Sequence, residues 1–442
     1  MKKLMWWGLL GVTAAGVALS GCGSGDDSNI SLRIANATLT HPSIDLYVNG
    51  GAAVKGTALD AVSNYATPGS GANTLQVNDS ASGAALSVSA PNLSGNDHYT
   101  LVAYESGGAV KTVVVPEDLP APVSGAAQVR LYDAAPDAGK LDVYITGPTD
   151  ALTNQSPAWS FTTGVVPSAS IPLTYPVGSY RVRVTASGSK TDVRLDMSAV
   201  ALANQQVATL IISPTSGGTL VNGSVLLEQS TYTAQRNTNA RVRLAAAVSG
   251  GATVAASATA PAGAPATSVA CTGPANSCVI DGGSVAPQFG FYTVVPANSA
   301  LNVTVNGASV AAPATALAAG ADTTLFVYGD PGTATASLLT DDSHLPTDTS
   351  TVKLSLLNGV TGAAGSLTLT ANSALVASNI APGTVSTSTP VAGSANAMNL
   401  RVTASNKAGV FISDSINYTL NPGAVYTVMV GGDASTPQLL LH

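Results

Sequence analysis

Short segments along the chain alternate apolar and polar residues with a period of two. Residues 44–48 read IDLYV and residues 141–145 read LDVYI. Such alternation predicts β-strands that turn one face to a core and the other face outward. Turn-forming clusters such as TPGSG at residues 67–71 separate these segments. The Ala-rich stretch 311–321 is interrupted by Pro313 and Gly320, so we expect a loop there rather than a helix.

The predicted strands recur in four copies. An opening strand is repeated at residues 31–34 (SLRI), 128–131 (QVRL), 240–244 (ARVRL) and 351–354 (TVKL). A later strand is repeated at residues 98–104, 207–212, 323–328 and 425–430. The pattern predicts four tandem antiparallel β-sandwiches. We call them repeats 1 to 4, at residues 31–120, 126–235, 238–346 and 350–442. With each unit about 35 Å across, four in line would form a rod on the order of 140 Å long.

The N-terminus has the features of an export signal. Lys2 and Lys3 precede an apolar stretch at residues 5–19, and residues 19–22 read LSGC. The apolar stretch is short for a membrane span, which needs about 20 residues. Charge, apolar stretch, small residues and cysteine, in this order, resemble the lipobox of bacterial lipoproteins. The alternative is an ordinary signal peptide followed by a chance cysteine.

The lipoprotein resemblance implies a cellular location as well as a lipid anchor. It implies a signal peptide at residues 1–21 and acyl chains such as palmitate on Cys22, followed by a flexible tether at residues 22–30. Two or three acyl chains hold a protein firmly at a membrane, whereas one does so only marginally. Because Gly23 stands where the inner-membrane retention signal has aspartate, we expect an outer-membrane lipoprotein, periplasmic or surface-exposed.

Composition and charge narrow the class of protein. Only 9% of residues are charged and 5% are aromatic, while 45% are hydrophobic. Few charges disfavour amphipathic helices, and the apolar content is too high for a disordered chain. The net charge is −7, and the 17 Lys and Arg residues form no long run. Because nucleic-acid binding needs clustered cations, the sequence argues against a nucleic-acid partner.

The opening repeats resemble a known bacterial family. Asn36-Ala37 followed by IDLY at residues 44–47, and AAPD at residues 134–137 followed by LDVY at residues 141–144, resemble the family called domain of unknown function 4397. Repeats 3 and 4 keep the strands but lose the Asp and Tyr. The resemblance implies extracytoplasmic immunoglobulin-like sandwiches in tandem. It implies no activity, because the family has none assigned.

One candidate contact face comes from the alternating strands. If Ile44 and Leu46 face the core, their polar neighbours face outward, where tyrosine is a suitable amphipathic anchor. The predicted contact face consists of Asp45, Tyr47, Asp142 and Tyr144. The alternative interpretation is that the two aspartates pair across strands with Arg33 and Arg130.

Few other residues suggest chemistry. Cys271 and Cys278 flank the turn sequence TGPANS, and an oxidising compartment favours a disulfide between them. Histidine occurs four times and never at metal-ligand spacing from a second His or Cys. The segment Asp341-Asp342 with His344 is either a weak cation site or a solvated linker. We therefore predict no metal, no cofactor and no catalytic residue.

These features favour a non-catalytic, lipid-anchored cell-envelope protein that acts in binding, adhesion or scaffolding. Its expected partners are the membrane, through the lipid, and an envelope protein or glycan. The alternative is a surface protein that binds or cleaves glycans. Trp159 is the one tryptophan outside the signal peptide, and carboxylates are sparse. Since glycosidases need paired carboxylates, this favours glycan binding over glycan cleavage.

Overall fold

The computed structural model describes residues 28–161, 170–263, 277–362, 364–406 and 417–442. These residues form β-strands and three short 3-10 turns, so the prediction of an all-β protein is confirmed. The turns are η1 (Pro136–Ala138), η2 (Leu152–Asn154) and η3 (Ser249–Gly251). Within the described residues, no helix is long and apolar enough to cross a membrane. Residues 1–21 and Cys22 lie outside the described part of the chain.

Repeat 1 consists of two main sheets and a small two-stranded one. The first sheet has the order β1-β8-β9, the second β3-β2-β5-β6, and β4 pairs with β7. The strands are β1 (Ser31–Ala37), β2 (Ser43–Val48), β3 (Gly51–Ala58), β4 (Gly71–Ala72), β5 (Leu75–Asp79), β6 (Ala85–Ser89), β7 (Asn92–Leu93), β8 (His98–Ser106) and β9 (Ala109–Pro116).

Repeat 2 is a two-sheet sandwich with the orders β13-β10-β16-β17-β18 and β12-β11-β14-β15. Its strands are β10 (Ala126–Asp133), β11 (Leu141–Thr146), β12 (Trp159–Phe161), β13 (Leu173–Pro176), β14 (Gly178–Ala186), β15 (Val193–Leu202), β16 (Val207–Pro214), β17 (Val221–Leu227) and β18 (Tyr232–Gln235).

Repeats 3 and 4 have the same arrangement of two sheets. In repeat 3 the orders are β22-β19-β26-β27, with β23 also paired to β19, and β21-β20-β24-β25. In repeat 4 they are β31-β28-β34-β35 and β30-β29-β32-β33. The strands of repeat 3 are β19 (Asn239–Val248), β20 (Thr253–Thr259), β21 (Ser277–Val285), β22 (Gln288–Phe289), β23 (Thr293–Pro296), β24 (Ala300–Val305), β25 (Ala308–Val310), β26 (Asp322–Gly329) and β27 (Thr335–Asp341). Those of repeat 4 are β28 (Thr351–Thr361), β29 (Leu367–Ala371), β30 (Ala374–Ile380), β31 (Thr389–Ala392), β32 (Ser394–Ala404), β33 (Asn417–Leu420), β34 (Val425–Asp433) and β35 (Gln438–Leu441).

The opening strand of every repeat pairs in parallel with the late shared strand. The four parallel pairs are β1 with β8, β10 with β16, β19 with β26, and β28 with β34. The other strand pairs within the described sheets are antiparallel. The parallel pair is the feature that the predicted antiparallel sandwich lacked. It places the opening and late sequence motifs side by side.

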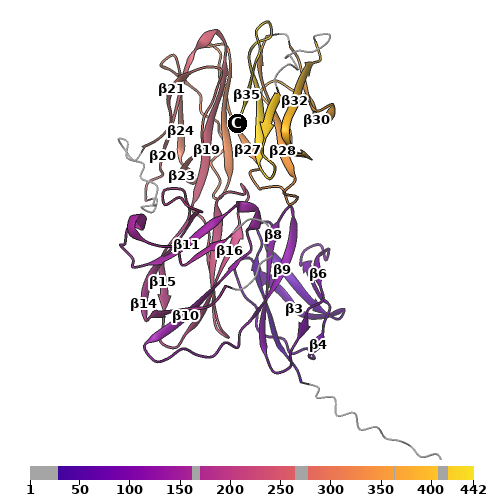
Figure 1. The fold of residues 1–442 in the computed structure, drawn as a ribbon, viewed down its shortest axis with the longest axis vertical. Helices are drawn as coiled ribbons and strands as arrows, with labels where there is room; N and C mark the ends of the chain where they lie inside the picture. The colour runs from indigo at the N-terminus through magenta and orange to yellow at the C-terminus, as the bar shows by residue number, and fades with distance from the viewer. Residues whose placement is uncertain (1–27, 162–169, 264–276, 363, 407–416) are drawn as a thin grey trace, which may run out of the picture.

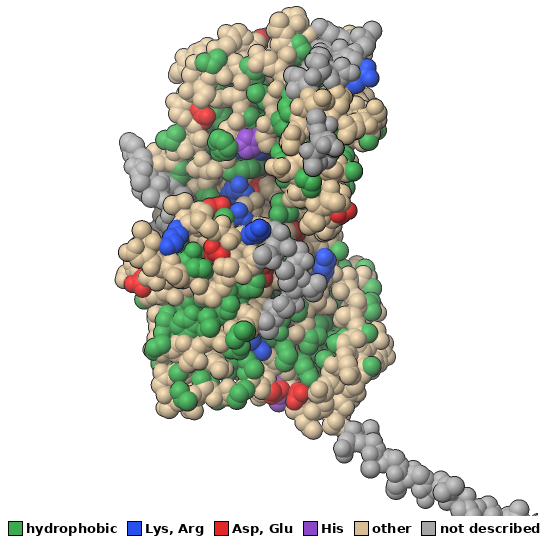
Figure 2. All heavy atoms as spheres, in the orientation of Figure 1, with side chains coloured by type: hydrophobic (Ala, Val, Ile, Leu, Met, Phe, Trp, Pro, Cys, Tyr) green, Lys and Arg blue, Asp and Glu red, His purple; other side chains and the backbone are tan. Residues whose placement is uncertain are grey.

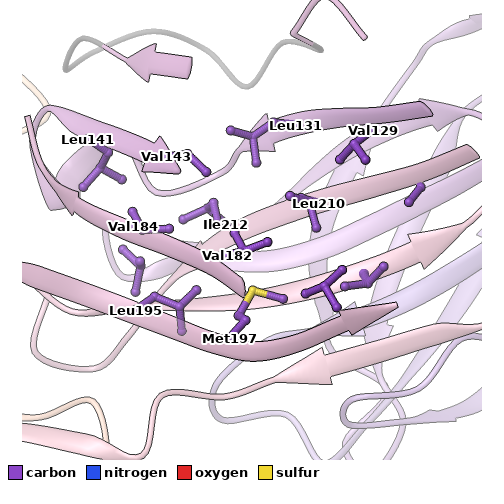
Figure 3. Close-up of a cluster of buried hydrophobic side chains, with 14 of the residues drawn as sticks. Val129, Leu131, Leu141, Val143, Val182, Val184, Leu195, Met197, Leu210 and Ile212 are labelled. Atoms are coloured by element: carbon purple, nitrogen blue, oxygen red, sulfur yellow. The ribbon is translucent and has the colours of Figure 1, made fainter. Parts of the chain in front are cut away.

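The core of each repeat lies between its two sheets. In repeat 2, Val129 and Leu131 of β10 face Leu141 and Val143 of β11 across the sandwich, and all four side chains are buried (Figure 3). In repeat 1, Ile44, Leu46 and Val48 are core residues, so the predicted inward face of this strand is confirmed. Burying a side chain of this size contributes about 1.5–3 kcal/mol.

The repeats pack in two pairs rather than in a line. Repeats 1 and 2 lie side by side in the lower half of Figure 1, and repeats 3 and 4 lie side by side in the upper half. Each pair has its own buried apolar interface between the outer faces of the first sheets. The interface of pair 1–2 includes Ala35, Val102, Tyr132 and Ile211, and that of pair 3–4 includes Ala245, Phe326, Leu357 and Met429. The expected four-unit rod is therefore wrong: the chain turns back, and repeats 1 and 4 lie on the same side of the molecule (Figure 1).

Close backbone contacts join the two pairs. Gly217 N donates to Gly320 O at 2.9 Å, and Ser343 N donates to Gly217 O at 2.9 Å. A Cβ on Gly218 would lie 2.3 Å from the backbone nitrogen of His344, so only glycine fits there. Asp137 O also accepts from Leu345 N at 2.9 Å. Repeat 2 is thus fixed against repeat 3 and against the segment that leads into repeat 4.

Candidate functional site

The predicted contact face is mostly buried. Asp45 is 6% exposed and Tyr47 is half-buried, whereas Asp142 and Tyr144 are 5% and 2% exposed. Side chains this buried are not available to a partner, so Tyr47 is the one member of the predicted face that remains accessible. The outward direction of these side chains was expected, but their covering by neighbouring turns was not.

Asp45 and Asp142 fasten local turns instead of pairing with the arginines. Asp45 accepts from Gly56 N at 2.9 Å and Ser80 Oγ at 2.6 Å, and Lys55 Nζ lies 3.0 Å away. Asp142 accepts in the same manner from Gly188 N at 2.8 Å and from a serine hydroxyl. Burial acts to raise the pKa of both carboxyls, but these hydrogen bonds hold each pKa below its usual value.

The arginines of the opening strands pair with other acids. Arg33 contacts Glu117 at 2.5 Å, and both side chains are almost fully buried. Arg33 also donates to Thr100 Oγ1 at 2.9 Å and to Ser230 O of repeat 2 at 2.5 Å. The predicted pairing of Asp45 with Arg33 is therefore wrong. Arg33 instead joins its own sheet to the neighbouring repeat.

Arg130 makes the corresponding contacts from repeat 2. It donates to Thr209 Oγ1 at 2.7 Å, lies 3.2 Å from Glu228, and donates to Pro116 O of repeat 1. Burial raises the pKa of Glu228 to about 7, although Arg130 opposes the shift. The predicted pairing of Asp142 with Arg130 is also wrong, because Arg130 pairs with Glu228 and Asp142 accepts from Gly188 N and a serine hydroxyl.

A cleft opens where the four repeats meet. We call it the waist cleft. It has a volume of about 1230 Å³, and its lining includes Gly108 of repeat 1, Ser216 of repeat 2, Arg241 and Asp341 of repeat 3, Lys353 and Thr387 of repeat 4, and the connecting segment 342–348. Figure 2 shows charged side chains gathered across the middle of this face, between the two pairs. The volume exceeds that of an ordinary ligand pocket, about 300–1000 Å³.

Aromatic rings and guanidinium groups stack along one wall of the cleft. The Arg241 guanidinium lies 4.2 Å from the centroid of the Tyr292 ring, and that of Arg243 lies 4.5 Å from it. Arg243 also lies 4.4 Å from the Phe289 ring, which in turn contacts His442 at 5.1 Å between ring centroids. Stacking of this type holds both cations in fixed positions.

Two aspartates contact the arginines and Tyr292 of this wall. Asp341 accepts from Tyr292 OH and from Thr324 Oγ1, each at 2.6 Å, and lies 3.4 Å from Arg243. Asp322 is fully buried and lies 2.8 Å from Arg241. Burial raises the pKa of Tyr292 above its usual value, with a further contribution from Asp341. Burial also raises the pKa of Asp322.

The segment Asp341-Asp342 with His344 is not a solvated linker. Asp342 lies 2.6 Å from Lys353 Nζ and 2.8 Å from His344 Nδ1, and His344 Nε2 lies 3.0 Å from Thr215 O of repeat 2. Burial acts to raise the pKa of Asp342 and to lower that of His344. Their mutual hydrogen bond, together with Lys353 for Asp342 and with the charges of Asp137 and Asp342 for His344, outweighs burial. The pKa of Asp342 therefore lies below its usual range and that of His344 lies above. The segment is a polar junction that lines the waist cleft.

Within the described residues, no group of three or more His, Cys, Asp or Glu side chains is placed to hold a metal ion. Of the predicted disulfide pair, Cys271 lies outside the described residues. Cys278 is 5% exposed in β21 and lies opposite Ala258 of β20. The disulfide stays a prediction.

Sequence reasoning missed the wall of the waist cleft. The segment QFGFY at residues 288–292 supplies three aromatic rings, two of which stack on arginines from β19. Three aromatic residues within five positions were a signal in a chain with 5% aromatic content. The acids opposite the arginines, Glu117, Glu228 and Asp341, lie at or just beyond the end of β9, β17 and β27. Because these acids lie far from the arginines in the sequence, the sequence pattern did not indicate that they pair.

Comparisons with known proteins give a family for the opening part of the chain. No curated protein matches the chain. One similar solved structure is that of CBMbc (family CBM26) from Eubacterium rectale Amy13K in complex with maltoheptaose, at 12% identity and TM-score 0.16, covering 45% of this chain and 96% of that one. Another is a candidate cell adhesion protein from Bacteroides uniformis, at 11% identity and TM-score 0.20, covering 49% of this chain and 97% of that one. Similarity at these scores carries no argument about function. Residues 30–144 match the model of the family described as domain of unknown function (DUF4397), which confirms the resemblance that the motifs of the opening repeats indicated.

Proposed function

We propose that the chain is a lipid-anchored protein of the bacterial cell envelope that binds a partner without catalysis, as a scaffolding or adhesion module. The observation that carries the non-catalytic part is how Asp341 and His344 are held in the waist cleft. Asp341 accepts two hydrogen bonds and contacts Arg243, and both ring nitrogens of His344 lie against oxygen acceptors. An imidazole that donates from both nitrogens cannot accept a proton.

The carboxyl groups of the cleft also suit binding better than hydrolysis. A glycosidase needs a protonated carboxylic acid that faces a second, ionised carboxylate across the scissile bond. Asp322 has a raised pKa, but it is fully buried and contacts Arg241. Asp342 has a lowered pKa and is held by Lys353 and His344. Neither is placed as a general acid at the surface of the cleft.

The anchor and the location are part of the same proposal. The motif LSGC at residues 19–22 supports lipidation of Cys22, and Gly23 supports the outer membrane. The described chain begins at the lower end of Figure 1, where Ser28 contacts Ser70 of repeat 1 at 3.2 Å between hydroxyl oxygens. With the tether at this end, pair 1–2 would lie nearer the membrane and pair 3–4 farther from it.

The proposal is tested with the mature lipidated protein, purified in detergent from its native membrane. We expect crosslinking in cells to capture an envelope protein or glycan. We also expect purified protein to leave oligosaccharide substrates uncleaved. The variant Cys22→Ala should carry no acyl chain and should be either unprocessed or released from the membrane. A hydrolytic activity that survives purification and is abolished by Asp341→Asn would overturn the non-catalytic part. Unmodified, soluble wild-type protein that starts at a residue other than Cys22 would overturn the anchor.

A further inference from the structure

The chemistry of the waist cleft points to a class of ligand. The walls carry four cationic groups, Arg241, Arg243, Lys353 and the His344 imidazole, and three acids, Asp341, Asp342 and Asp348, while Asp322 beside Arg241 is a fourth acid. The two sets lie together and largely pair with each other, as the distances between Arg243 and Asp341 and between Lys353 and Asp342 show. A strongly anionic ligand would meet the acids, and a cationic ligand would meet the arginines. The balance favours a ligand without net charge.

Hydroxyl groups form the largest class of side chains that line the cleft. They include Ser216, Thr340, Thr347, Thr387 and Ser388, and they come from repeats 2, 3 and 4 and from the segment between repeats 3 and 4. Each hydroxyl can both donate and accept, and so can be matched by a ligand that does the same. Apolar side chains are fewer in the lining than side chains with a hydroxyl group, although apolar atoms form more of its exposed surface than polar atoms do. A purely apolar ligand would leave the hydroxyl groups without partners. The lining therefore fits a ligand that is itself rich in hydroxyl groups.

An exposed aromatic ring stands beside this polar surface. Phe291 is 82% exposed, and its ring lies 5.1 Å from the ring of His442, which lines the cleft. Phe291 is not itself part of the lining, so it can contact a bound ligand where that ligand extends past His442. A flat apolar ring beside many hydrogen-bonding groups suits a ligand that has an apolar ring face and hydroxyls around its edge.

We propose that the waist cleft binds a neutral oligosaccharide. A sugar ring has hydroxyls that donate and accept and no net charge, and it has an apolar face that suits Phe291 where the oligosaccharide extends past His442. The volume of about 1230 Å³ exceeds that of an ordinary small-molecule site, so a segment of several sugar units fits better than one. All four repeats contribute to the lining, and the site therefore depends on the packing of the two pairs. The inference rests on the proposed binding function and names its ligand.

The test uses the mature lipidated protein in a detergent without a sugar headgroup, because such a headgroup would compete. The probes are neutral oligosaccharides of glucose, galactose, mannose and N-acetylglucosamine with two to seven units, measured by isothermal titration calorimetry. The variant is Thr347→Trp. Thr347 is exposed and lines the cleft, so an indole there occupies the cleft without disturbing a core. The control is Thr191→Trp, at an exposed threonine outside the cleft.

We expect at least one probe to bind the wild type and Thr191→Trp with equal affinity. The same probe should bind Thr347→Trp at least about tenfold more weakly. Unchanged melting temperatures would show that both variants fold. Binding that Thr347→Trp leaves unchanged would overturn the cleft as the site, and binding confined to acidic oligosaccharides or peptides would overturn the ligand class. No binding of any probe would overturn the saccharide inference. In that case, a crosslink to an envelope protein in cells would still support the proposed binding function. If no crosslink formed either, both the saccharide inference and the proposed binding function would be overturned.

Discussion

Arg33 and Thr100 lie directly opposite each other in the parallel pair of β1 and β8, and the arginine Nε donates to the threonine Oγ1 at 2.9 Å. The same relationship recurs in repeats 2 and 3, where the register pairs Arg130 with Thr209 and Arg243 with Thr324. In repeat 4 the register places Ser355 opposite Thr427. There Arg243 of repeat 3 reaches across and donates to Thr427 Oγ1 at 3.1 Å. One buried arginine position thus links neighbouring strands within a sheet and repeats within a pair.

The first prediction concerns the acid that neutralises Arg33. Glu117→Ala should lower the free energy of unfolding by about 3–5 kcal/mol, because it leaves a buried guanidinium without its carboxylate. Urea unfolding of the mature protein measures this. The control is Lys55→Ala. The Lys55 side chain is 59% exposed in its pair with Asp45, and an exposed pair contributes less than about 1 kcal/mol. Equal losses in the two variants would show that Arg33 does not depend on Glu117.

The sequence pattern predicts the inward faces of the strands well and the outward faces poorly. Alternation places Ile44 and Leu46 in the core of repeat 1, and they lie there. It says nothing about what covers the other face, because that depends on which repeats pair. Strand β16 is buried at every position, and the run VATLII at residues 207–212 is a signal for a strand that is covered on both faces. The candidate site escaped prediction for the same reason, since its residues come from four repeats.

The second prediction concerns Asp133, near the interface of repeats 1 and 2. Burial raises its pKa from 3.8 to about 6. The folded protein therefore holds this proton over a range where the unfolded chain has lost it. The resulting stabilisation is full below about pH 4 and is lost as the pH rises through about 6. We expect the stability of Asp133→Asn, relative to wild type, to rise by about 3 kcal/mol across this window.

Urea unfolding at several pH values between about 4 and 7 measures the effect. The control is Asp192→Asn, where the carboxyl is 46% exposed, and we expect it to leave the pH dependence as in wild type. A constant difference between Asp133→Asn and wild type over the whole range would contradict the raised pKa.

The third prediction concerns the contact between the two pairs. Gly218 has φ +91°, and a Cβ there would lie 2.3 Å from the backbone of His344. Gly218→Ala should therefore separate pair 1–2 from pair 3–4 and increase the radius of gyration in small-angle scattering. Gly188→Ala is the matched control, because Gly188 has φ +79° with nothing within 4 Å. Both variants have the left-handed backbone cost of about 1–2 kcal/mol. If both scatter like the wild type, the pairs are not joined through Gly218.

The fourth prediction distinguishes the two tyrosines of the predicted contact face. Tyr144 is 2% exposed, so Tyr144→Ala should lower the free energy of unfolding by about 3 kcal/mol or more. Tyr47 is half-buried, and its hydroxyl accepts from Lys55 Nζ at 2.5 Å. We expect Tyr47→Ala to cost less than half as much. Thermal and urea unfolding measure both variants, and equal losses would contradict the difference in burial.

The last prediction concerns the cysteines. Six residues separate Cys271 from Cys278, a spacing that a hairpin tip can close. The proposed location in the cell envelope would place both cysteines in an oxidising compartment. We expect a disulfide that contributes about 2–3 kcal/mol in the chain-entropy model. Because Cys278 is 5% exposed within the core of repeat 3, Cys278→Ala would mix loss of packing with loss of the bond. Cys271→Ala is therefore the better variant, and it should lower the melting temperature of the oxidised protein while leaving that of the reduced protein unchanged. Mass spectrometry of protein from the native envelope, alkylated before reduction, should show neither thiol modified, and alkylation of both would refute the bond.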